Sequence, residues 1–336
     1  MKEQDKKMFQ ELTDLSVRMG NNLDIIQANG GNTSIKSDSY LYVKGSGKKL
    51  ANAKIENIFA KVLIQNLSKG ISLSSVDQKI NKSQAKMIKP SIEVSLHKLI
   101  KSKIVLHSHP IDIIAQTIGE NGREHLENTL KDINWTWIDY FKPGKDLARE
   151  IKIQMYKKAS NVYILQNHGL IIGGETPKAA EVLQNKILNL TKLNKRKFEF
   201  TQKDKLRYLS TKLPFKTYLP KHEVIHSLAI DNWSYQLSQK NPHCPDHAVL
   251  CGIRPNIIDL NKQKLSDVNS KLPYLIIKDI GVIFSENNDT LEAMLRSQAE
   301  IFLRLTKNTK VKLLSKNQCE DLINWDAEKF RKKMIE

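Results

Sequence analysis

Predicted strands and helices alternate through the middle of the chain, and this alternation constrains the fold more than any other feature. Residues 103–107 contain three consecutive apolar residues between a lysine and a histidine, and they predict a buried strand. Pro110 then permits a helix to begin at once and to continue through about Ile118. The alternation goes on with predicted strands at 135–140, 162–165 and 170–172 and helices at 145–158 and 176–193. Such a pattern predicts an α/β fold built around a layered sheet.

Two histidines at the end of the first buried strand suggest a metal site. In Leu106-His107-Ser108-His109-Pro110, His107 and His109 are two residues apart, so in an extended segment they point to the same face. His168, in Asn167-His168-Gly169, can complete the set. Three nitrogen ligands leave a coordination position open, as in catalytic zinc sites. The alternative is that the pair is ordinary polar packing, which is more common for an isolated His-x-His on a strand.

Two glycine-containing turns lie in the N-terminal part of the chain. A predicted helix over residues 3–20 is followed by the turn Ala28-Asn29-Gly30-Gly31-Asn32-Thr33-Ser34, and two short strands near Ile35 and 41–43 lead to the turn at 44–49. After a polar stretch at 66–85, which we interpret as a loop, Pro90-Ser91 predicts a helix to about Lys101 with Ser91 as its N-cap. Turns and helix N-termini expose backbone N–H groups that bind phosphate. These glycines can also serve only to turn the chain.

The last third of the chain has a pattern similar to that around His168. A charged run at 195–205 marks a candidate domain boundary. The segment 274–284 then predicts strand, turn and strand, followed by a helix from about Thr290. Aligned with residues 162–193, it places Gly281 on Gly169 and Ile280 in the position of His168. We interpret the tail as a possible degenerate copy without the metal ligand, although this unit also arises by chance.

The positive charge of the chain favours small anionic ligands over nucleic acid. The formal net charge is +18, and a field of that sign attracts polyanions. However, 45 lysines against 9 arginines are spread along the whole length, with no zinc-finger spacing, aromatic RNA-binding signature or basic zipper. We expect a solvated lysine surface that steers a phosphorylated metabolite, and no specific nucleic-acid partner.

The sequence favours a cytoplasmic location. The charged start does not resemble a secretory signal, and no apolar run approaches the length of about 18 residues that a membrane span needs. The three cysteines, Cys244, Cys251 and Cys319, form an odd set without metal-type spacing. This usage fits reduced thiols in the cytosol rather than a disulfide framework.

Four elements together resemble the class II aldolase/adducin family: Gly30-Gly31-Asn32-Thr33-Ser34, Gly45-Ser46-Gly47, Pro90-Ser91-Ile92-Glu93-Val94-Ser95-Leu96-His97 and the three histidines. The resemblance covers roughly residues 5 to 195. It implies a layered α/β fold with a central, mostly antiparallel sheet flanked by helices. We therefore expect a catalytic domain at 1–200 and a smaller α/β extension at 201–336.

The segments Trp137 to Gly144 and Pro245-Asp246-His247-Ala248-Val249 resemble a long branch of the family. That branch is similar to the aldolase part of rhamnulose-1-phosphate aldolases fused to a short-chain dehydrogenase. We expect no dehydrogenase here, because the sequence contains no dinucleotide-binding glycine fingerprint.

The resemblance implies roles for the metal ligands and for one carboxylate. His107, His109 and His168 would bind a divalent ion, most simply Zn²⁺, with Mn²⁺, Co²⁺ or Fe²⁺ as replacements. Glu93 would be the general acid/base. The alternative for Glu93 is structural, since a glutamate in the third helical position often completes a capping box. For His97 we expect a polar contact or a core position.

The resemblance also implies a phosphate site and a subunit contact. Gly31, Asn32, Ser46, Gly47 and Ser91 would bind the phosphate and nearby substrate oxygens. Position 92 is isoleucine where some members have a second serine, which removes one hydroxyl donor.

Tyr140 matches a tyrosine that donates a proton across a subunit boundary in sugar-phosphate aldolases, although it can equally pack its ring at a strand end. If it acts in catalysis, the protein is a closed homo-oligomer, and a tetramer is expected.

These expectations predict a metal-dependent aldolase that cleaves or forms a carbon–carbon bond in a phosphorylated ketose, giving dihydroxyacetone phosphate and an aldehyde. Because one enediolate can lead to several products, a sugar-phosphate epimerase or dehydratase on the same site is the nearest alternative. Some epimerase relatives carry aspartate at the position of Glu93, so the longer side chain favours an aldolase. A non-catalytic adducin-like scaffold is the alternative from another class.

Overall fold

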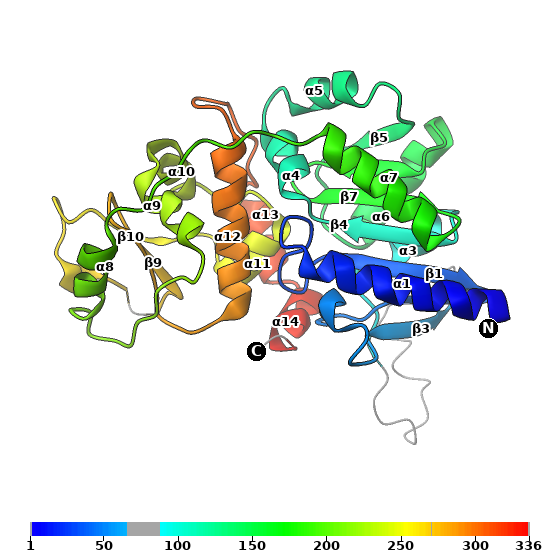
Figure 1. Cartoon of the computed structure of the whole chain (residues 1–336), viewed down its shortest axis with the longest axis horizontal. Helices are drawn as coiled ribbons and strands as arrows, with labels where there is room; N and C mark the ends of the chain where they lie inside the picture. Colours follow the sequence, from blue (N-terminus) through cyan, green and yellow to red (C-terminus); the bar gives the residue numbers. More distant parts are fainter. Residues whose placement is uncertain (1, 66–87, 270, 335–336) are drawn as a thin grey trace. The chain divides into compact units, whose positions relative to one another are not determined.

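The computed structural model describes residues 2–65, 88–269 and 271–334, and the predicted loop at 66–85 lies outside these ranges (Figure 1). The chain divides into two compact units. The first contains Met1–Pro110, Leu130–Leu190 and Phe330–Glu336, and the second contains Ile111–Thr129 and Thr191–Lys329. The division at residues 200 and 201 stays a prediction. No helix among the described residues is both long and apolar enough to cross a membrane.

A seven-stranded sheet forms the centre of the first unit. Its strands, in spatial order, are β3 (Phe59–Leu63), β2 (Tyr40–Lys44), β1 (Asn32–Ser37), β4 (Ile104–Ser108), β7 (Gly169–Gly174), β6 (Val162–Leu165) and β5 (Trp135–Ile138). All neighbours are antiparallel except β5 and β6. The mixed α/β class and the mostly antiparallel sheet are therefore confirmed.

The register of the central strands determines which residues share one end of the sheet. Asn32 at the start of β1 lies opposite His107 of β4, and His107 lies opposite Ile171 of β7. The predicted strand at 135–140 ends at Ile138, because the backbone N–H of Tyr140 donates to the side chain of Gln166 at 3.3 Å instead of to a neighbouring strand.

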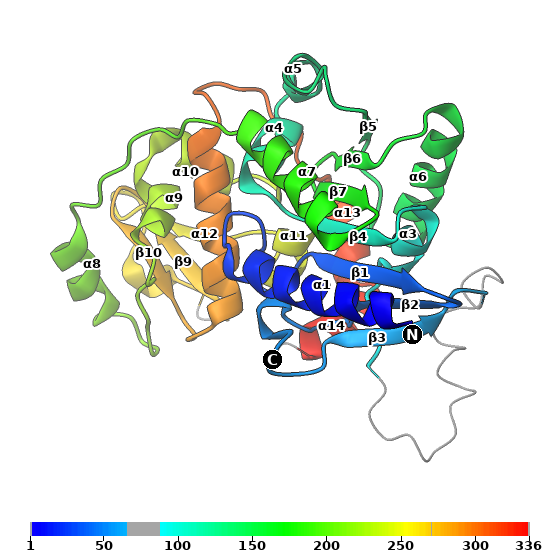
Figure 2. The same cartoon turned by 45° about the vertical axis from the view of Figure 1, so that its right-hand side comes forward.

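Helices cover both faces of this sheet. On one face α1 (Glu3–Asn21) and α7 (Pro177–Leu190) lie side by side, as both views show (Figures 1 and 2). On the other, α3 (Val94–Leu99) and α6 (Lys145–Lys157) pack together over a buried cluster whose members include Leu96, Ile151 and Tyr163. The short helix η1 (Leu50–Asn52) packs against α1. Apolar residues at helical and strand spacing on these elements form the core.

The second unit combines a small sheet with helices. The sheet has the order β10 (Gly281–Phe284), β9 (Tyr274–Ile277) and β8 (Asn256–Ile258), with β9 antiparallel to β10 and parallel to β8. The helices are α4 (Ile111–Ile118), α5 (Gly122–Thr129), α8 (Lys203–Ser210), η4 (Glu223–His226), α9 (Ser227–Ile230), α10 (Asn232–Ser238), α11 (Pro245–Cys251), η5 (Leu265–Asp267), α12 (Asp289–Arg304) and α13 (Lys316–Ile323). Helix α14 (Asp326–Lys333) begins in this unit, and its last residues belong to the first.

Candidate metal centre

Three histidine side chains converge at one end of the large sheet. His107 is on β4, His109 follows that strand, and His168 precedes β7. Their ligand atoms all lie within 4.8 Å of one another, and the three rings are buried. Among the described residues, no other group of three His, Cys, Asp or Glu side chains is close enough to share an ion. The structure thus places the three histidines together, as the sequence predicts.

A tight turn brings His168 to β4. Asn167 has a left-handed backbone with φ 57°, and the N–H of His168 donates to the carbonyl of Leu165 at 3.2 Å. Gly169 then passes so close to β4 that a Cβ atom there would lie 2.2 Å from the carbonyl oxygen of Ser108. Only glycine permits this approach, which brings the third ring next to the other two.

The hydrogen bond of His107 fixes which of its nitrogens faces the site. Its Nδ1–H donates to the carbonyl of Leu170 at 3.1 Å, so Nε2 faces the Nε2 of His109, also at 3.1 Å. Burial lowers the pKa of His107 well below its usual value, and the neighbouring His168 and His109 lower it further. A metal-binding histidine commonly donates its second N–H to a backbone carbonyl in this way. The donor set fits a divalent ion of the zinc type.

Glu93 lies against this cluster. Its Oε2 atom is 3.3 Å from His107 Nε2, and its Oε1 atom is 3.5 Å from His168 Nε2. The side-chain amide of Asn32 donates to Oε2 at 2.7 Å. The carboxylate is buried and is held beside the imidazoles by hydrogen bonding. Such a group is well placed to move a proton.

The start of α3 differs from the prediction. Glu93, not Ser91, is at the N-cap, and its side chain makes no capping hydrogen bond. The Ser91 hydroxyl accepts from the Glu93 N–H at 3.2 Å, and the Ser91 N–H donates to the carbonyl of Lys44 at 3.1 Å. The helix starts later because Ser91 first closes a turn of its own. The capping-box alternative for Glu93 is therefore wrong.

His97 has a structural position, as expected. Its Nδ1 lies 2.7 Å from the hydroxyl of Ser34, and the ring is completely buried. Burial lowers the pKa of His97 to about 3, and the charges of Lys36 and Lys44 contribute. The ring is neutral at physiological pH and connects α3, which carries it, to Ser34 of β1.

Lys44 and Asn29 connect the two glycine turns, a role that no sequence pattern indicated for either residue. The buried ammonium of Lys44 donates to the carbonyls of Asn29 at 2.5 Å and Lys48 at 2.9 Å. The Asn29 amide donates to the carbonyl of Gly47. The only sequence signal is a lysine at the end of a predicted strand, which is ordinary on a solvated face. Lys44 instead holds the two glycine turns together through its ammonium group.

The second turn offers an anion fewer donors than predicted. The N–H groups of Gly45, Ser46 and Lys48 donate to protein carbonyls. The Ser46 hydroxyl is buried and has no hydrogen-bond partner among the described residues. Ser46 and Gly47 therefore remain candidates, Ser46 through its hydroxyl. Gly31 lies just before β1, where a Cβ atom would meet the carbonyl oxygen of His107 at 2.8 Å.

Tyr140 lies two residues beyond the end of β5 and is half-buried. The preceding strand runs parallel to β6, with Ile138 opposite Leu165, and His168 follows β6. Tyr140 and His168 therefore both lie beyond the carboxyl ends of these two parallel strands. The predicted role of Tyr140 across a subunit boundary stays a prediction.

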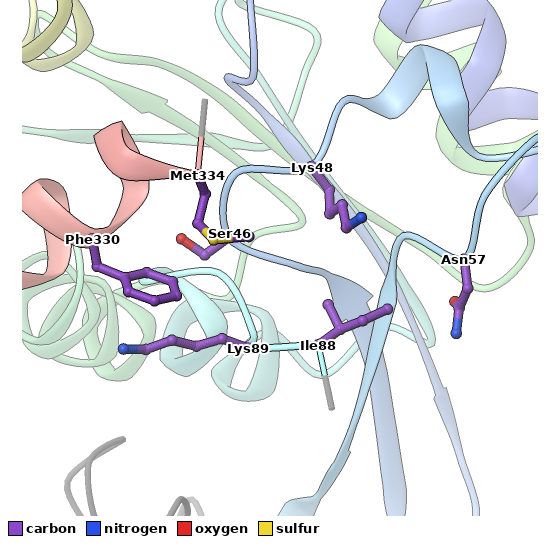
Figure 3. Close-up of a pocket in the computed structure, with 7 residues that line it drawn as sticks. All are labelled: Ser46, Lys48, Asn57, Ile88, Lys89, Phe330 and Met334. Atoms are coloured by element: carbon purple, nitrogen blue, oxygen red, sulfur yellow. The ribbon is translucent and has the colours of Figure 1, made fainter. Parts of the chain in front are cut away.

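A pocket of about 500 Å³ lies beside the second glycine turn (Figure 3). Its lining residues are Ser46, Lys48, Asn57, Ile88, Lys89, Phe330 and Met334. The segment that lines the pocket leads on to Glu93, because the carbonyl of Lys89 accepts from the Ser46 N–H at 2.8 Å and Glu93 follows Lys89 by four residues. Neither Lys89 nor Phe330 stood out in the sequence, because neither belongs to a motif.

The family match identifies the class of protein. Residues 10–189 match the family described as class II aldolase and adducin N-terminal domain. This match covers more than half of the 336 residues, so the chain belongs to this family.

A Bacillus subtilis (strain 168) protein named uncharacterized oxidoreductase YuxG is 22% identical over an alignment of 352 positions, gaps included. The alignment covers 88% of this chain and 50% of that protein. The chain thus spans about half the length of this curated relative.

Several solved structures are also similar. The N-terminal class II aldolase domain of a conserved Thermoplasma acidophilum protein is 26% identical, covers 54% of this chain and 90% of its own, and has a TM-score of 0.46. A sugar-phosphate aldolase from Thermotoga maritima is 14% identical, with 62% and 97% covered and a TM-score of 0.44. L-fuculose-1-phosphate aldolase from Thermus thermophilus is 13% identical, with 55% and 91% covered and a TM-score of 0.39.

Proposed function

We propose that this protein is a metal-dependent aldolase that cleaves or forms a carbon–carbon bond in a phosphorylated ketose, with dihydroxyacetone phosphate and an aldehyde as the smaller molecules. The observation that carries the proposal is the contact of the Glu93 carboxylate with His107 and His168, two of three convergent imidazoles. A proton-transfer group beside a metal-type donor set is what formation of an enediolate requires.

His107, His109 and His168 would hold the ion, for which we propose zinc. When bound, a divalent ion supplies Lewis acidity that stabilises the negative charge developing on the substrate oxygens. The protein supplies the orientation of the donors. The Leu170 carbonyl fixes the His107 ring, and the Gly169 turn brings His168 against β4.

Glu93 would move the proton. In the synthetic direction its carboxylate removes a proton from the carbon next to the carbonyl of dihydroxyacetone phosphate, and in the cleavage direction it returns that proton. The amide of Asn32 holds the Oε2 atom of Glu93 in place, so the carboxylate needs little reorganisation before it reacts. For Tyr140 we propose donation of a proton to the oxygen of the aldehyde, from a neighbouring subunit of a homotetramer.

The phosphate would bind beside the second glycine turn. Ser46 and Ser91 offer hydroxyl groups, and Gly31 and Gly47 allow close approach of the backbone. The formal net charge of +18 draws such substrates to the surface.

The similarity to about half of a protein named an oxidoreductase is consistent with the long branch indicated by the sequence. We propose that this chain corresponds to the aldolase-type part of that branch, and that it acts in the cytoplasm.

The direct test is proton exchange in D₂O. Metal-loaded protein incubated with dihydroxyacetone phosphate alone should replace one carbon-bound hydrogen by deuterium, as seen by NMR, and adding an aldehyde should give a new ketose phosphate. His109→Ala should do neither. A product that differs from a sugar phosphate only in configuration, or by loss of water, would instead show an epimerase or a dehydratase.

A further inference from the structure

The end of α14 forms part of the pocket beside the second glycine turn, although it lies far outside the family match at 10–189. Phe330 and Met334 line the pocket together with Ser46 (Figure 3). Gly47 has φ +74°, and a Cβ atom there would lie 2.6 Å from the Cβ atom of Met334. The turn and the C-terminal segment are therefore in close contact.

Among the described residues that line this pocket, Lys89 is the lysine without a carboxylate partner. Its ammonium lies 4.1 Å from the centre of the Phe330 ring, and no carboxylate of the described residues forms an ion pair with it. The other lysine of the lining, Lys48, forms an ion pair with Glu56 at 2.5 Å. An aromatic face restricts an ammonium group but leaves its charge uncompensated. Lys89 therefore keeps the capacity to bind an anion.

A buried hydroxyl lies in the same pocket. Ser46 is 9% exposed, and its Oγ atom has no hydrogen-bond partner among the described residues. The backbone N–H of Ser46 donates to the carbonyl of Lys89 at 2.8 Å, so this hydrogen bond holds the two residues next to each other. A buried hydroxyl without a partner is costly unless a ligand satisfies it. The cation and the hydroxyl together suit a small dianion.

On the basis of the proposed function, we propose that Lys89 binds the anionic group of the substrate and that Phe330, from the C-terminal helix, positions its ammonium. Lys89 is then a specificity-determining residue that favours phosphorylated over uncharged substrates, and Phe330 is a positioning residue. The C-terminal segment completes the substrate pocket of its own chain.

The chain contains a matched control for this pair. The ammonium of Lys61 lies 4.1 Å from the centre of the Tyr40 ring, which is the same separation as in Lys89 and Phe330. Lys61 and Tyr40 are on β3 and β2, outside the pocket lining. Removing the charge of Lys61 changes the net charge as much as removing that of Lys89.

The test is calorimetric binding of inorganic phosphate and of dihydroxyacetone phosphate to the metal-loaded protein. Lys89→Met should weaken both by about tenfold to hundredfold, as expected for loss of a charge-assisted hydrogen bond. Phe330→Leu should weaken both by about threefold to tenfold, since it removes a cation–π contact. Phe330→Tyr, which keeps an aromatic face, should bind like the unaltered protein, and so should Lys61→Met.

Equal binding by Lys89→Met and the unaltered protein would overturn the proposal. An equal loss in Lys61→Met would also overturn it, because the effect would then be long-range charge, and so would failure of the unaltered protein to bind either anion. Lys89→Arg provides a second variant that keeps the charge, and retained binding there supports the assignment. Equilibrium binding needs no turnover, so absence of aldol chemistry with intact, Lys89-dependent binding would refute only the proposed function.

Discussion

The strand–turn–strand that carries His168 and the corresponding segment of the second unit have the same local geometry but different chemistry. In both, a strand ends, three residues turn the chain, and an antiparallel strand begins with glycine, with Leu165 opposite Gly169 in one and Ile277 opposite Gly281 in the other. The middle turn residue is left-handed in both, with φ 57° and φ 59°. In both, a third strand runs parallel to the first and a long helix follows.

The difference lies in two features of the surroundings. The third turn residue is His168 in the first unit and the buried Ile280 in the second, where it joins an apolar cluster with Ile277 and Ile283. In the first unit, β7 pairs with β4, which carries His107 and is followed by His109, whereas β10 is at the edge of the described small sheet. The same backbone frame therefore supports either a metal-type site or an apolar core. The chemistry depends on one side chain and one neighbouring strand.

The largest expected effect comes from removing the histidine that distinguishes the turn at 166–168 from the turn at 278–280. His168→Ala should lower the rate of aldol cleavage by at least about a thousandfold, because stabilisation of the developing charge is lost. The measurement is kcat/KM together with elemental analysis of the purified variant. Full activity in this variant would show that the turn histidine has no catalytic role.

The next effect separates the carboxylate from the metal. Glu93→Gln should retain the ion but exchange the proton of dihydroxyacetone phosphate about a hundredfold to ten-thousandfold more slowly, since it removes the proton-transfer group. Metal content and exchange rate are measured on the same sample. Exchange at the original rate would assign the proton transfer to another residue.

The pH dependence of stability tests the role of the buried His226 in the second unit. The Nδ1 of His226 accepts from the N–H of Val282 on β10 at 3.1 Å, and burial lowers the pKa of His226 to about 4, with Glu223 opposing and Lys203 assisting the shift.

Because the folded pKa of His226 is below the ordinary value, the unfolded chain takes up the proton first, and stability falls as the pH drops from about 6.5 towards 4. Between pH 7 and pH 5 this amounts to a loss of about 2 kcal/mol. His226→Asn, which keeps an acceptor but does not titrate, should show a correspondingly smaller loss in denaturant unfolding. Parallel pH profiles for the two proteins would contradict this assignment.

The smallest effect on metal binding is expected from the reverse exchange. Ile280→His should bind no additional ion, because no strand carrying a His-x-His pair is paired with β10 in the described small sheet. It should destabilise the second unit by about 1–3 kcal/mol, since it places a polar ring in an apolar cluster. A second bound ion would show that the turn histidine alone is sufficient.

The sequence predicted the α/β frame from local periodicity, whereas the meeting of His168 with the other two histidines was implied by the family resemblance. Alternating apolar runs define the strands, and a two-residue spacing places His107 and His109 on one face. The same periodicity aligned Gly281 with Gly169. The start of α3 was misplaced because Ser91 closes a separate turn, which is a matter of individual hydrogen bonds.

The positions of Lys44, Lys89 and Phe330 could not be predicted, because each of these residues makes its contacts with residues that are distant in the sequence. Lys44 connects two turns through its ammonium, and a lysine at a strand end is ordinary by itself. Phe330 reaches the pocket from the C-terminal helix, far along the sequence from the residues it contacts. Charge compensation and burial become visible only once the chain is folded.

The metal content of the purified protein is the most direct test of the proposed metal centre, and it is determined by elemental analysis after exhaustive dialysis and reloading with Zn²⁺. We predict one ion per chain in the unaltered protein and in Ile280→His, and a loss of that ion in His109→Ala. An unaltered protein that retains no divalent ion, or a His109→Ala variant that retains it with equal affinity, would contradict the proposed metal centre.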